Sequence, residues 1–221
     1  MCSERNLQTG SRRGKLIIIS GFSGVGKGTL MKELQATYPG QYALSVSVTT
    51  RSPRAGETDG ISYHFKTQEE FDRLIKEDYF VEYARYTGKS YGTPKPFVEE
   101  NLAAGRNVIL EIELQGALIV REKYPDAKLV FITTKDAKTL VQRLTGRGTE
   151  TEEVIRKRLA RAVEEANGVE QYHHIIVNDE LSAAVKELHE VIQTENGSRI
   201  SEAELALITD IQSDLKERLS I

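Results

Sequence analysis

The chain has 221 residues and nearly balanced charges, with 30 Lys and Arg against 33 Asp and Glu for a formal net charge of −3. Hydrophobic residues make up 39% and charged residues 29%, which excludes the disordered and fibrous classes and indicates a globular protein. The charge balance argues against a dedicated nucleic-acid-binding protein, which carries a strong basic excess.

Cysteine content and apolar runs predict the compartment. The one cysteine, Cys2, excludes an intramolecular disulfide and a cysteine-based zinc or iron–sulfur centre. The longest early apolar run, Leu16 to Ile19, is far short of a membrane span or a signal-peptide core. These features predict a soluble, cytoplasmic protein that makes no contact with a membrane.

The first predicted elements form a strand, a loop and a helix. A polar lead-in, residues 1–13, precedes the β-branched run Lys15 to Ser20, which is typical of a strand buried on both faces. The glycine-rich loop from Gly21 to Thr29 follows directly and opens a helix that we expect to end near Tyr38.

The segment from about residue 43 to 93 is rich in strands, tyrosines and loops, and we interpret it as an inserted lobe. Thr67 and Glu70 fit a capping box that opens a helix. Gly88 and Gly92 are expected to mark turns. The expected strands of the lobe are Ala43–Val48, Ser62–Lys66 and Phe80–Tyr86.

The second half alternates strands and helices, which predicts an α/β fold with a mainly parallel sheet flanked by helices. The expected strands are Asn107–Glu113, Leu129–Thr133 and Ile175–Val177. The expected helices lie between Pro94 and Gly105, up to Leu144, over Thr149–Ala166 and over Ser182–Gln193.

The last segment, residues 194–221, is predicted to be a linker followed by a helical tail. Its apolar residues fall roughly on one helical face: Leu205, Ile208, Leu215 and Leu219. Such a stripe packs either on its own domain or on another subunit, so self-association through the tail is a second interpretation.

Gly21, Gly26 and Lys27 have the spacing of a phosphate-binding loop, or P-loop, and they lie between a buried strand and a helix. In such a loop successive backbone N–H groups point inward at a helix N-terminus, whose dipole also favours anions. The lysine adds a positive charge against the terminal phosphates. The residues predicted to bind ATP here are Gly21, Phe22, Ser23, Gly24, Val25, Gly26, Lys27, Gly28 and Thr29.

The position after the lysine departs from the usual pattern. It normally carries Ser or Thr, whose hydroxyl contacts Mg²⁺, whereas here it is Gly28, with Thr29 one residue further on. We therefore expect Mg²⁺ to be held mainly by phosphates and waters. The GKGT sequence is similar to that of several nucleoside monophosphate kinases.

Five segments, in the same order along the chain, resemble the guanylate kinase family. They are SVSVTTRSPRAGETDGISYHF, FVEYARYTGKSYGTP, NVILEIELQGA, RLTGRGTETEEVIRKRL and IIVND, and the resemblance covers residues 14–193. It implies phosphoryl transfer from ATP to GMP with Mg²⁺, giving ADP and GDP in purine nucleotide metabolism. It also implies that ATP and GMP are the binding partners.

The resemblance assigns the GMP site to the lobe and the strand after it. Arg51 and Arg54 lie three residues apart in a loop, where guanidinium groups can grip a phosphate bidentately. Carboxylates suit guanine, which presents two hydrogen-bond donors where adenine presents none at C2 and an acceptor at N1. The implied GMP-binding residues are Ser47, Arg51, Arg54, Tyr63, Glu82, Tyr91, Thr93 and Glu113.

Two acids end the strand that we expect over Asn107–Glu113. Glu111 and Glu113 are two apart, so we expect both to project to the same side of that strand, toward the ligand crevice. Glu113 stands where many guanylate kinases carry Asp. Glu111 is a candidate for assisting the metal shell, and salt bridges to lobe arginines are the alternative for both acids.

Residues 144–160 resemble the family's lid, in which Arg147 and Arg158 reach the ATP phosphates on closure and Arg143 lies close by. Considered alone, this charged helix is typical of a solvated face with ion pairs. Asn178 and Asp179 fall where relatives pass near the adenine, although a turn before a helix explains them as well. The predicted catalytic residues are Lys27, Arg51, Arg147 and Arg158.

The implied chemistry needs positive charge around two phosphates and the exclusion of water, supplied by closure of lobe and lid. The accepting phosphate oxygen is largely ionised at pH 7, since the second pKa of the phosphate is about 6, so no general base is expected among the histidines.

Two alternative functions remain. The first is a guanylate-kinase-like domain that only binds partner proteins, which the intact phosphate loop disfavours. The second is an enzyme with another acceptor, which Glu82 and Glu113 disfavour.

Overall fold

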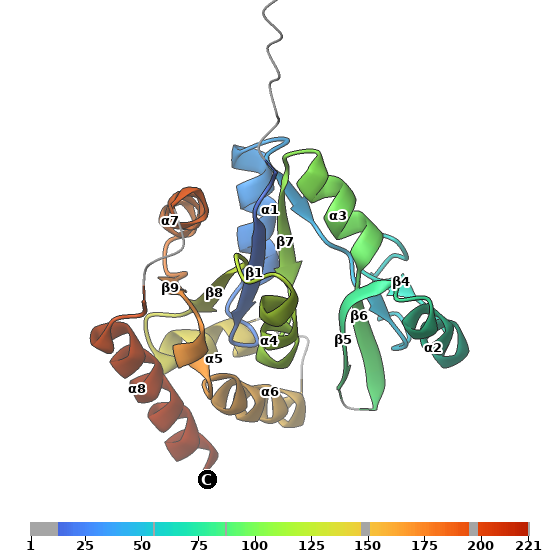
Figure 1. The fold of residues 1–221 in the computed structure, drawn as a ribbon. Coiled ribbons are helices and arrows are strands. Elements are labelled where there is room, and N and C mark those ends of the chain that lie inside the picture. The colour runs from blue at the N-terminus through green and yellow to red at the C-terminus, as the bar shows by residue number, and fades with distance from the viewer. Residues whose placement is uncertain (1–12, 55, 87, 147–150, 195–198, 221) are drawn as a thin grey trace, which may run out of the picture.

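The computed structural model describes residues 13–54, 56–86, 88–146, 151–194 and 199–220. Within them, one parallel sheet has the strand order β2-β7-β1-β8-β9, and a second, mixed sheet has the order β4-β3-β6-β5 (Figure 1). The first consists of β1 (Leu16–Gly21), β2 (Tyr42–Leu44), β7 (Asn107–Glu111), β8 (Lys128–Thr133) and β9 (His174–Val177). The second consists of β3 (Val48–Thr49), β4 (His64–Phe65), β5 (Phe80–Tyr86) and β6 (Lys89–Pro94).

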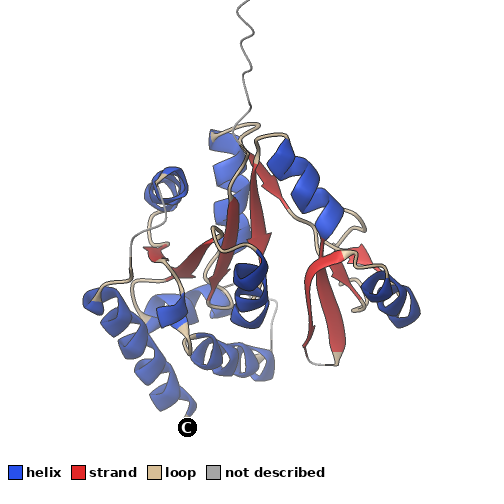
Figure 2. Ribbon diagram, in the orientation of Figure 1, coloured by secondary structure: helices blue, strands red, loops and turns tan. Residues whose placement is uncertain are grey.

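Helices cover the parallel sheet, as an α/β fold requires, and the mixed sheet projects to one side as a separate lobe (Figure 2). The helices are α1 (Lys27–Thr37), α2 (Gln68–Lys76), α3 (Lys95–Ala103), α4 (Leu114–Lys123), α5 (Ala137–Thr145), α6 (Glu152–Glu165), α7 (Leu181–Gln193) and α8 (Glu202–Leu219), with a 3₁₀ turn η1 at Val169–Gln171. None of the helices in the described residues has both the length and the apolar character to cross a membrane.

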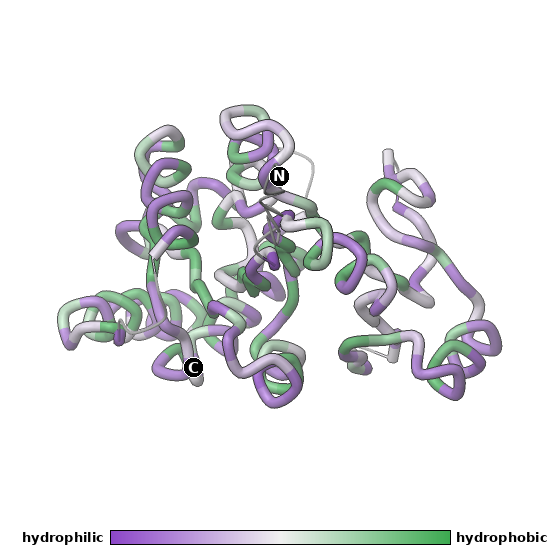
Figure 3. The backbone as a smooth tube through the Cα atoms, turned by 45° about the horizontal axis from the view of Figure 1, so that its top comes forward, coloured by the Kyte–Doolittle hydropathy of each residue, from purple (hydrophilic) through white to green (hydrophobic). Residues whose placement is uncertain are grey.

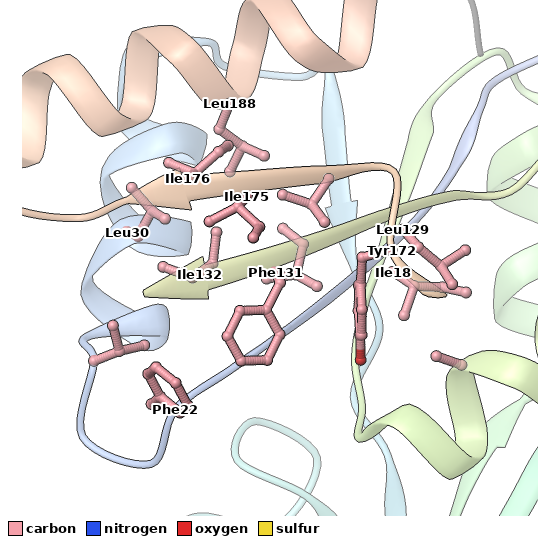
Figure 4. Close-up of a cluster of buried hydrophobic side chains, with 14 of the residues drawn as sticks. Ile18, Phe22, Leu30, Leu129, Phe131, Ile132, Tyr172, Ile175, Ile176 and Leu188 are labelled. Carbon is pink, nitrogen blue, oxygen red and sulfur yellow. The ribbon is translucent and has the colours of Figure 1, made fainter. Parts of the chain in front are cut away.

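The centre of the parallel sheet is formed by two strands whose residues are all buried, β1 and β8. Burial on both faces explains their apolar runs, Leu16–Ile19 and Leu129–Ile132, and Figure 3 shows hydrophobic segments running through the body. Aromatic rings extend this core, since Phe22 packs edge-on against Phe131 at 5.1 Å and Phe131 against Tyr172 at 5.4 Å (Figure 4). The first residue of the phosphate loop after β1 is therefore anchored in the core.

The single strand expected over Ala43–Val48 is wrong, because the chain changes sheets within it. The Ser45 N–H still donates to the Ile109 carbonyl of the parallel sheet, at 2.9 Å. Two residues later, the Ser47 carbonyl accepts from the His64 N–H of the lobe, also at 2.9 Å. The residues form β2 and β3, strands of different sheets, and an apolar pattern alone does not reveal such a crossing.

The lobe keeps the expected capping box, in which Glu70 N–H donates to the Thr67 hydroxyl and Thr67 N–H to the Glu70 carboxylate. Gly88 lies in the turn between β5 and β6 with a φ of 75°, as expected. Gly92 does not mark a turn, since it lies inside β6. A Cβ there would stand 2.7 Å from the Phe80 ring, so close packing is the reason for this glycine.

The lobe has a small core of its own, made of Val48, Phe71 and Phe80. Each of these side chains is at most 3% exposed, and the rings of Phe71 and Phe80 stack at 4.7 Å. The lobe is therefore held by far fewer buried side chains than the body around the parallel sheet.

The strand expected over Asn107–Glu113 ends two residues early. β7 stops at Glu111, and Glu113 is the N-cap of α4, a helix that the sequence pattern did not predict. Glu111 and Glu113 therefore do not share one side of a strand. The later expected elements are confirmed by β8, α5, α6, β9 and α7, and α6 begins after its N-cap Thr151.

The tail forms α8, and its apolar face packs on its own domain. Ile208, Leu215 and Leu219 are at most 3% exposed, and α8 contacts both α5 and α6. Two hydrogen bonds fix it to α6: the Arg156 guanidinium donates to the Leu219 carbonyl at 2.8 Å, and the Gln212 amide donates to the Val163 carbonyl at 2.8 Å. This confirms the first interpretation of the stripe, and self-association stays a prediction.

We expect Leu215→Ala to lower the free energy of unfolding by about 2–5 kcal/mol, because Leu215 is completely buried and its truncation leaves a cavity. Urea denaturation would measure this. Ser213→Ala, at an exposed position of the same helix, is the matched control and should change stability by less than about 0.5 kcal/mol. Equal stabilities of the two variants would contradict the packing of α8 on the body.

Candidate active site

The phosphate loop connects β1 to α1 and depends on glycines with positive φ. Gly24 and Gly26 have φ values of 91° and 95°, which side chains disfavour. Gly21 is required for a second reason, since a Cβ there would lie 2.3 Å from the Ile132 carbonyl oxygen. The loop therefore turns its backbone toward the N-terminus of α1, where anions are favoured.

Within the loop, side chains and backbone have separate tasks. Phe22 and Val25 are completely buried, so these two residues offer a ligand only their backbone. The Lys27 ammonium group donates to the Gly21 carbonyl at 2.8 Å and to the Phe22 carbonyl at 3.3 Å. This holds the lysine across the mouth of its own loop.

Neighbouring elements hold the loop from outside. The Val25 carbonyl accepts from the Asn178 amide and from the Arg143 guanidinium, both at 2.9 Å. On the other side, the Ser23 N–H donates to the Glu165 carboxylate at 2.7 Å. The ends of β9, α5 and α6 thus fix the loop conformation.

The loop opens into a cavity of about 630 Å³. The predicted loop residues that line it are joined by Arg158 of α6, which the sequence also predicted. Arg147 lies outside the described residues. The lining residues are Ser23, Gly24, Gly26, Lys27, Gly28, Thr29, Lys32, Glu111 and Arg158.

A second cavity of about 390 Å³ shares Gly24, Gly26 and Thr29 with the first. Arg143, Asn178 and Asp179 complete it, together with Gly146 and Leu181. The Arg143 guanidinium lies between the phosphate loop and the segment after β9, because it donates to the Val25 carbonyl and also to the Asp179 carbonyl at 3.4 Å. The expected neighbours of the adenine are therefore beside the phosphate loop.

The donor set near the loop suits a magnesium ion that keeps waters and phosphates as ligands. Glu111 and Thr29 bring a carboxylate and a hydroxyl to the cavity that Lys27 lines, and Mg²⁺ prefers oxygen ligands with few from protein. Among the described residues, no three His, Cys, Asp or Glu side chains gather into a closed metal site.

In the lobe, the structure brings Arg51 together with the two predicted tyrosines. The Arg51 guanidinium lies 5.1 Å from the centre of the Tyr63 ring, and the rings of Tyr63 and Tyr91 are 6.2 Å apart. Glu57 binds the same guanidinium bidentately, at 2.8 and 2.9 Å, and this pairing raises the pKa of Arg51. Arg51 is thus oriented by a carboxylate before any phosphate arrives.

The remaining lobe residues have different surroundings. Arg54 has an exposed side chain, and its backbone N–H donates to Glu57 at 2.7 Å. Ser47 lies at the crossing between the two sheets. Glu57 therefore fixes the loop that carries both predicted arginines.

Glu82 is a buried carboxylate on β5, only 5% exposed. The Thr93 hydroxyl donates to one of its oxygens at 2.6 Å, and a Cβ at Gly116 would lie 2.9 Å from the other. Burial raises the pKa of Glu82, which the Thr93 hydrogen bond and the charge of Lys123 oppose. A buried carboxylate of this kind is suited to a ligand that brings hydrogen-bond donors.

Glu113 faces helix α6 instead of the lobe. Its carboxylate accepts from the Arg161 guanidinium of α6 at 2.5 Å, and its side chain is 48% exposed. The reason is its place at the N-cap of α4 rather than on β7. The two acids expected at the guanine thus have unlike environments, one buried beside Thr93 and one ion-paired at the surface.

Sequence reasoning missed several residues that shape this site. The sequence pattern identifies Arg161 and Glu165 only as part of a charged helix, although their spacing of four places them on one face of α6. The role of Gly116 had no sequence signal, because it depends on Glu82 packing against α4. Two of the histidines have structural contacts, since His189 stacks on Tyr38 at 3.7 Å and His173 accepts from the Leu129 N–H; that no histidine acts as a general base stays a prediction.

Comparison with known proteins gives consistent matches. The family model described as guanylate kinase matches residues 13–195. Guanylate kinases of Streptococcus mutans and Streptococcus agalactiae are each 48% identical over 186 residues, covering 84% of this chain and 89% of theirs. A crystal structure of guanylate kinase from Anaplasma phagocytophilum is similar with a TM-score of 0.68 at 26% identity, covering 96% of this chain and 98% of that one.

The raised pKa of Glu82 predicts a pH-dependent stability. The folded protein retains a proton at Glu82 above 4.5, the ordinary carboxyl value, where the unfolded chain has released it. The Glu82 contribution to the free energy of unfolding therefore falls as pH rises from there through the folded pKa, and is constant above it. We expect Glu82→Gln to gain stability relative to the wild type across that window.

Urea denaturation of both proteins between about pH 4 and pH 8 measures this difference. Glu100→Gln, at an exposed position of α3, is the matched control for removing one carboxylate. A stability difference between Glu82→Gln and wild type that is the same at every pH would contradict the raised pKa.

Proposed function

The chain belongs to the guanylate kinase family and phosphorylates GMP to GDP with ATP, and from that premise we propose which side chains perform each part of the reaction. The observation that carries the assignment is that the structure holds two separate groups suited to phosphates: Lys27 and Arg158 at the phosphate-loop cavity, and Arg51 with Tyr63 and Tyr91 in the lobe. One phosphate-binding group in the α/β body and another in the lobe suit the transfer of a phosphoryl group between two nucleotides.

We propose that residues 14–193 form the catalytic domain, with the inserted lobe at about 43–93 and the lid at about 144–160. The domain suits the nucleotide-rich cytoplasm, where ATP and GMP occur and where a lone cysteine stays reduced. The tail after residue 194 supports the lid helix through the packing of α8 on α6.

On the donor side, Lys27 binds the terminal phosphates of ATP, and the backbone N–H groups of residues 24–28 surround them. Arg158 and Arg147 add positive charge from the lid. Mg²⁺, which the family generally uses, would be held by Thr29, Glu111, waters and phosphates, and would neutralise charge on the phosphate oxygens. Arg143 and Asn178 place the adenine beside the second cavity.

On the acceptor side, Arg51 and Arg54 bind the phosphate of GMP, with the hydroxyls of Tyr63 and Tyr91 as further donors. Arg51 is supported in this role by its contact with Tyr63 and its bidentate pair with Glu57. Ser47 and Thr93 are further polar groups of this site. Arginine suits it because its planar fork matches a phosphate.

Glu82 and Glu113 accept hydrogen bonds from guanine. Glu82 is the stronger candidate, since it is buried and only hydrogen-bond donors satisfy a buried carboxylate. Adenine offers no donor at its N1 and C2 positions, so binding AMP would leave such a carboxylate unpaired, at a cost of about 1–3 kcal/mol or more. The specificity for guanine over adenine then rests on hydrogen bonds that guanine donates to this carboxylate and adenine cannot.

The transfer itself needs position and charge. The GMP phosphate oxygen is already ionised, since its pKa is about 6, and it attacks the terminal phosphate of ATP in line. Lys27, Arg51, Arg147 and Arg158 are the proposed catalytic residues, because each places positive charge near the phosphates. Closure of the lobe and the lid excludes water, which would otherwise accept the phosphoryl group.

The direct test is ADP formation from ATP and Mg²⁺ with GMP, AMP, UMP, CMP and dTMP offered in turn. We expect GMP to support turnover at least about a hundredfold faster than AMP, since a mismatched donor pattern costs at least about 3 kcal/mol for the two carboxylates together. Comparable turnover with AMP or a pyrimidine nucleotide would contradict the assignment of the guanine-reading carboxylates.

Arg51→Ala separates the acceptor site from the donor site. We expect the KM for GMP to rise by at least about tenfold, because a charge-assisted pair with the phosphate is lost, while the KM for ATP changes by less than about twofold. Arg73→Ala, at an exposed position on lobe helix α2, is the matched control. Steady-state kinetics would measure both constants, and an unchanged KM for GMP would remove Arg51 from the acceptor site.

A further inference from the structure

Arg161, on lid helix α6, joins carboxylates that belong to separate parts of the site. Its guanidinium donates to Glu113 at 2.5 Å and to Glu164 at 2.7 Å, and it lies 3.6 Å from Glu165. Its side chain is 24% exposed, so these interactions are partly shielded from water. Glu164 and Glu165 belong to the same helix, whereas Glu113 caps α4, 48 residues away in sequence.

Glu165 continues this chain of contacts to the phosphate loop. One of its oxygens faces Arg161, and the other accepts the Ser23 N–H at 2.7 Å. Its side chain is only 15% exposed. Burial raises the pKa of Glu165, and the nearby charges of Lys27 and Arg161 oppose that rise. Lys27, Arg161 and the Ser23 N–H thus stabilise the ionised form of Glu165 against the larger, opposing effect of burial.

The path Glu113–Arg161–Glu165–Ser23 connects the acceptor side with the donor side through one side chain. We propose that Arg161 is a positioning residue that couples the two nucleotide sites, because it divides its charge between Glu113, which reads the guanine, and Glu165, which holds the phosphate loop. The inference rests on the proposed function, because it takes Glu113 to be a guanine-reading group.

The electrostatics give the coupling its sign. Guanine donors attract the Glu113 carboxylate and so compete with Arg161 for it. The Arg161 charge is then shared less with Glu113 and more with Glu165, which strengthens the ionised carboxylate that holds the Ser23 N–H. GMP therefore stabilises the loop conformation that binds ATP, and by reciprocity ATP favours GMP binding by the same factor.

The test measures this coupling factor directly. Calorimetry would give the Kd of GMP alone and with a saturating, non-hydrolysable ATP analogue and Mg²⁺. We expect a wild-type Kd for GMP that falls on the order of fivefold when the analogue is present. Arg161→Met, which keeps an unbranched side chain but removes the guanidinium, should bring that ratio close to one.

Three further variants make the result specific. Arg161→Lys keeps the charge but loses the planar fork, so we expect it to restore part of the ratio. Glu165→Gln should lower the ratio as Arg161→Met does, because it breaks the same path. Lys157→Met is the matched control on the exposed face of α6, where Lys157 pairs with Glu153, and should keep the wild-type ratio.

Either of two results would overturn the proposal: a wild-type ratio of one, or an Arg161→Met ratio equal to that of the wild type. Glu113→Gln distinguishes this failure from a failure of the proposed site. If Glu113→Gln leaves the Kd of GMP unchanged, the guanine-reading role of Glu113 is wrong, and the coupling proposal falls with it. If Glu113→Gln weakens GMP binding and Arg161→Met keeps the ratio, only the coupling proposal is wrong.

Folding is checked by circular dichroism and by the Kd of the ATP analogue alone. Should Arg161→Met fail to fold, Arg161→Lys and Glu165→Gln carry the same test, since a ratio unchanged in both would overturn the proposal. A merely structural role for Arg161 would lower stability without changing the ratio in folded variants.

Discussion

A phosphate loop has to present backbone N–H groups to its ligand, and the rest of the molecule has to hold that backbone in place without covering those groups. Here the holding contacts come from outside the loop. Asn178 and Arg143 bind the Val25 carbonyl, and Glu165 binds the Ser23 N–H. The parallel sheet supplies the rest, because Phe22 is buried against Phe131 in the core. The α/β body can be understood as the support for this one loop.

A second feature of the site is that two of its arginines, Arg51 and Arg161, are paired with carboxylates in this structure. Glu57 holds Arg51 by two hydrogen bonds, and Glu113 shares Arg161 with Glu165. An arginine held in this way has lost much of its rotamer freedom before a nucleotide binds, so less entropy is lost on binding. Each carboxylate also offsets the positive charge of the guanidinium group that it binds. The guanidinium groups of Arg51 and Arg161 are thus oriented by carboxylates before a substrate binds.

The sequence predicted most of the body and the loop, because their signals are local: buried β-branched runs, glycines at fixed spacing and a capping box at Thr67 and Glu70. It did not predict that residues 43–48 divide between two sheets, since one apolar run looks the same in either sheet. It placed Glu113 on a strand, whereas a helix begins there. The positions of Arg161, Glu165 and Gly116 depend on contacts between elements far apart in sequence, and no local pattern encodes such contacts.

The small core of the lobe, with Val48, Phe71 and Phe80 as its buried side chains, has a consequence for how order is distributed in the molecule. Local opening costs less free energy where few apolar contacts have to be broken. We therefore expect the amide hydrogens of the lobe to exchange with solvent before those of the body. The predicted acceptor-binding residues of the lobe therefore lie on a part of the fold that has fewer buried apolar side chains than the body. A nucleotide bound there adds its own binding free energy to that part and protects it from opening. In the proposed function, the acceptor nucleotide thereby stabilises the lobe to which it binds.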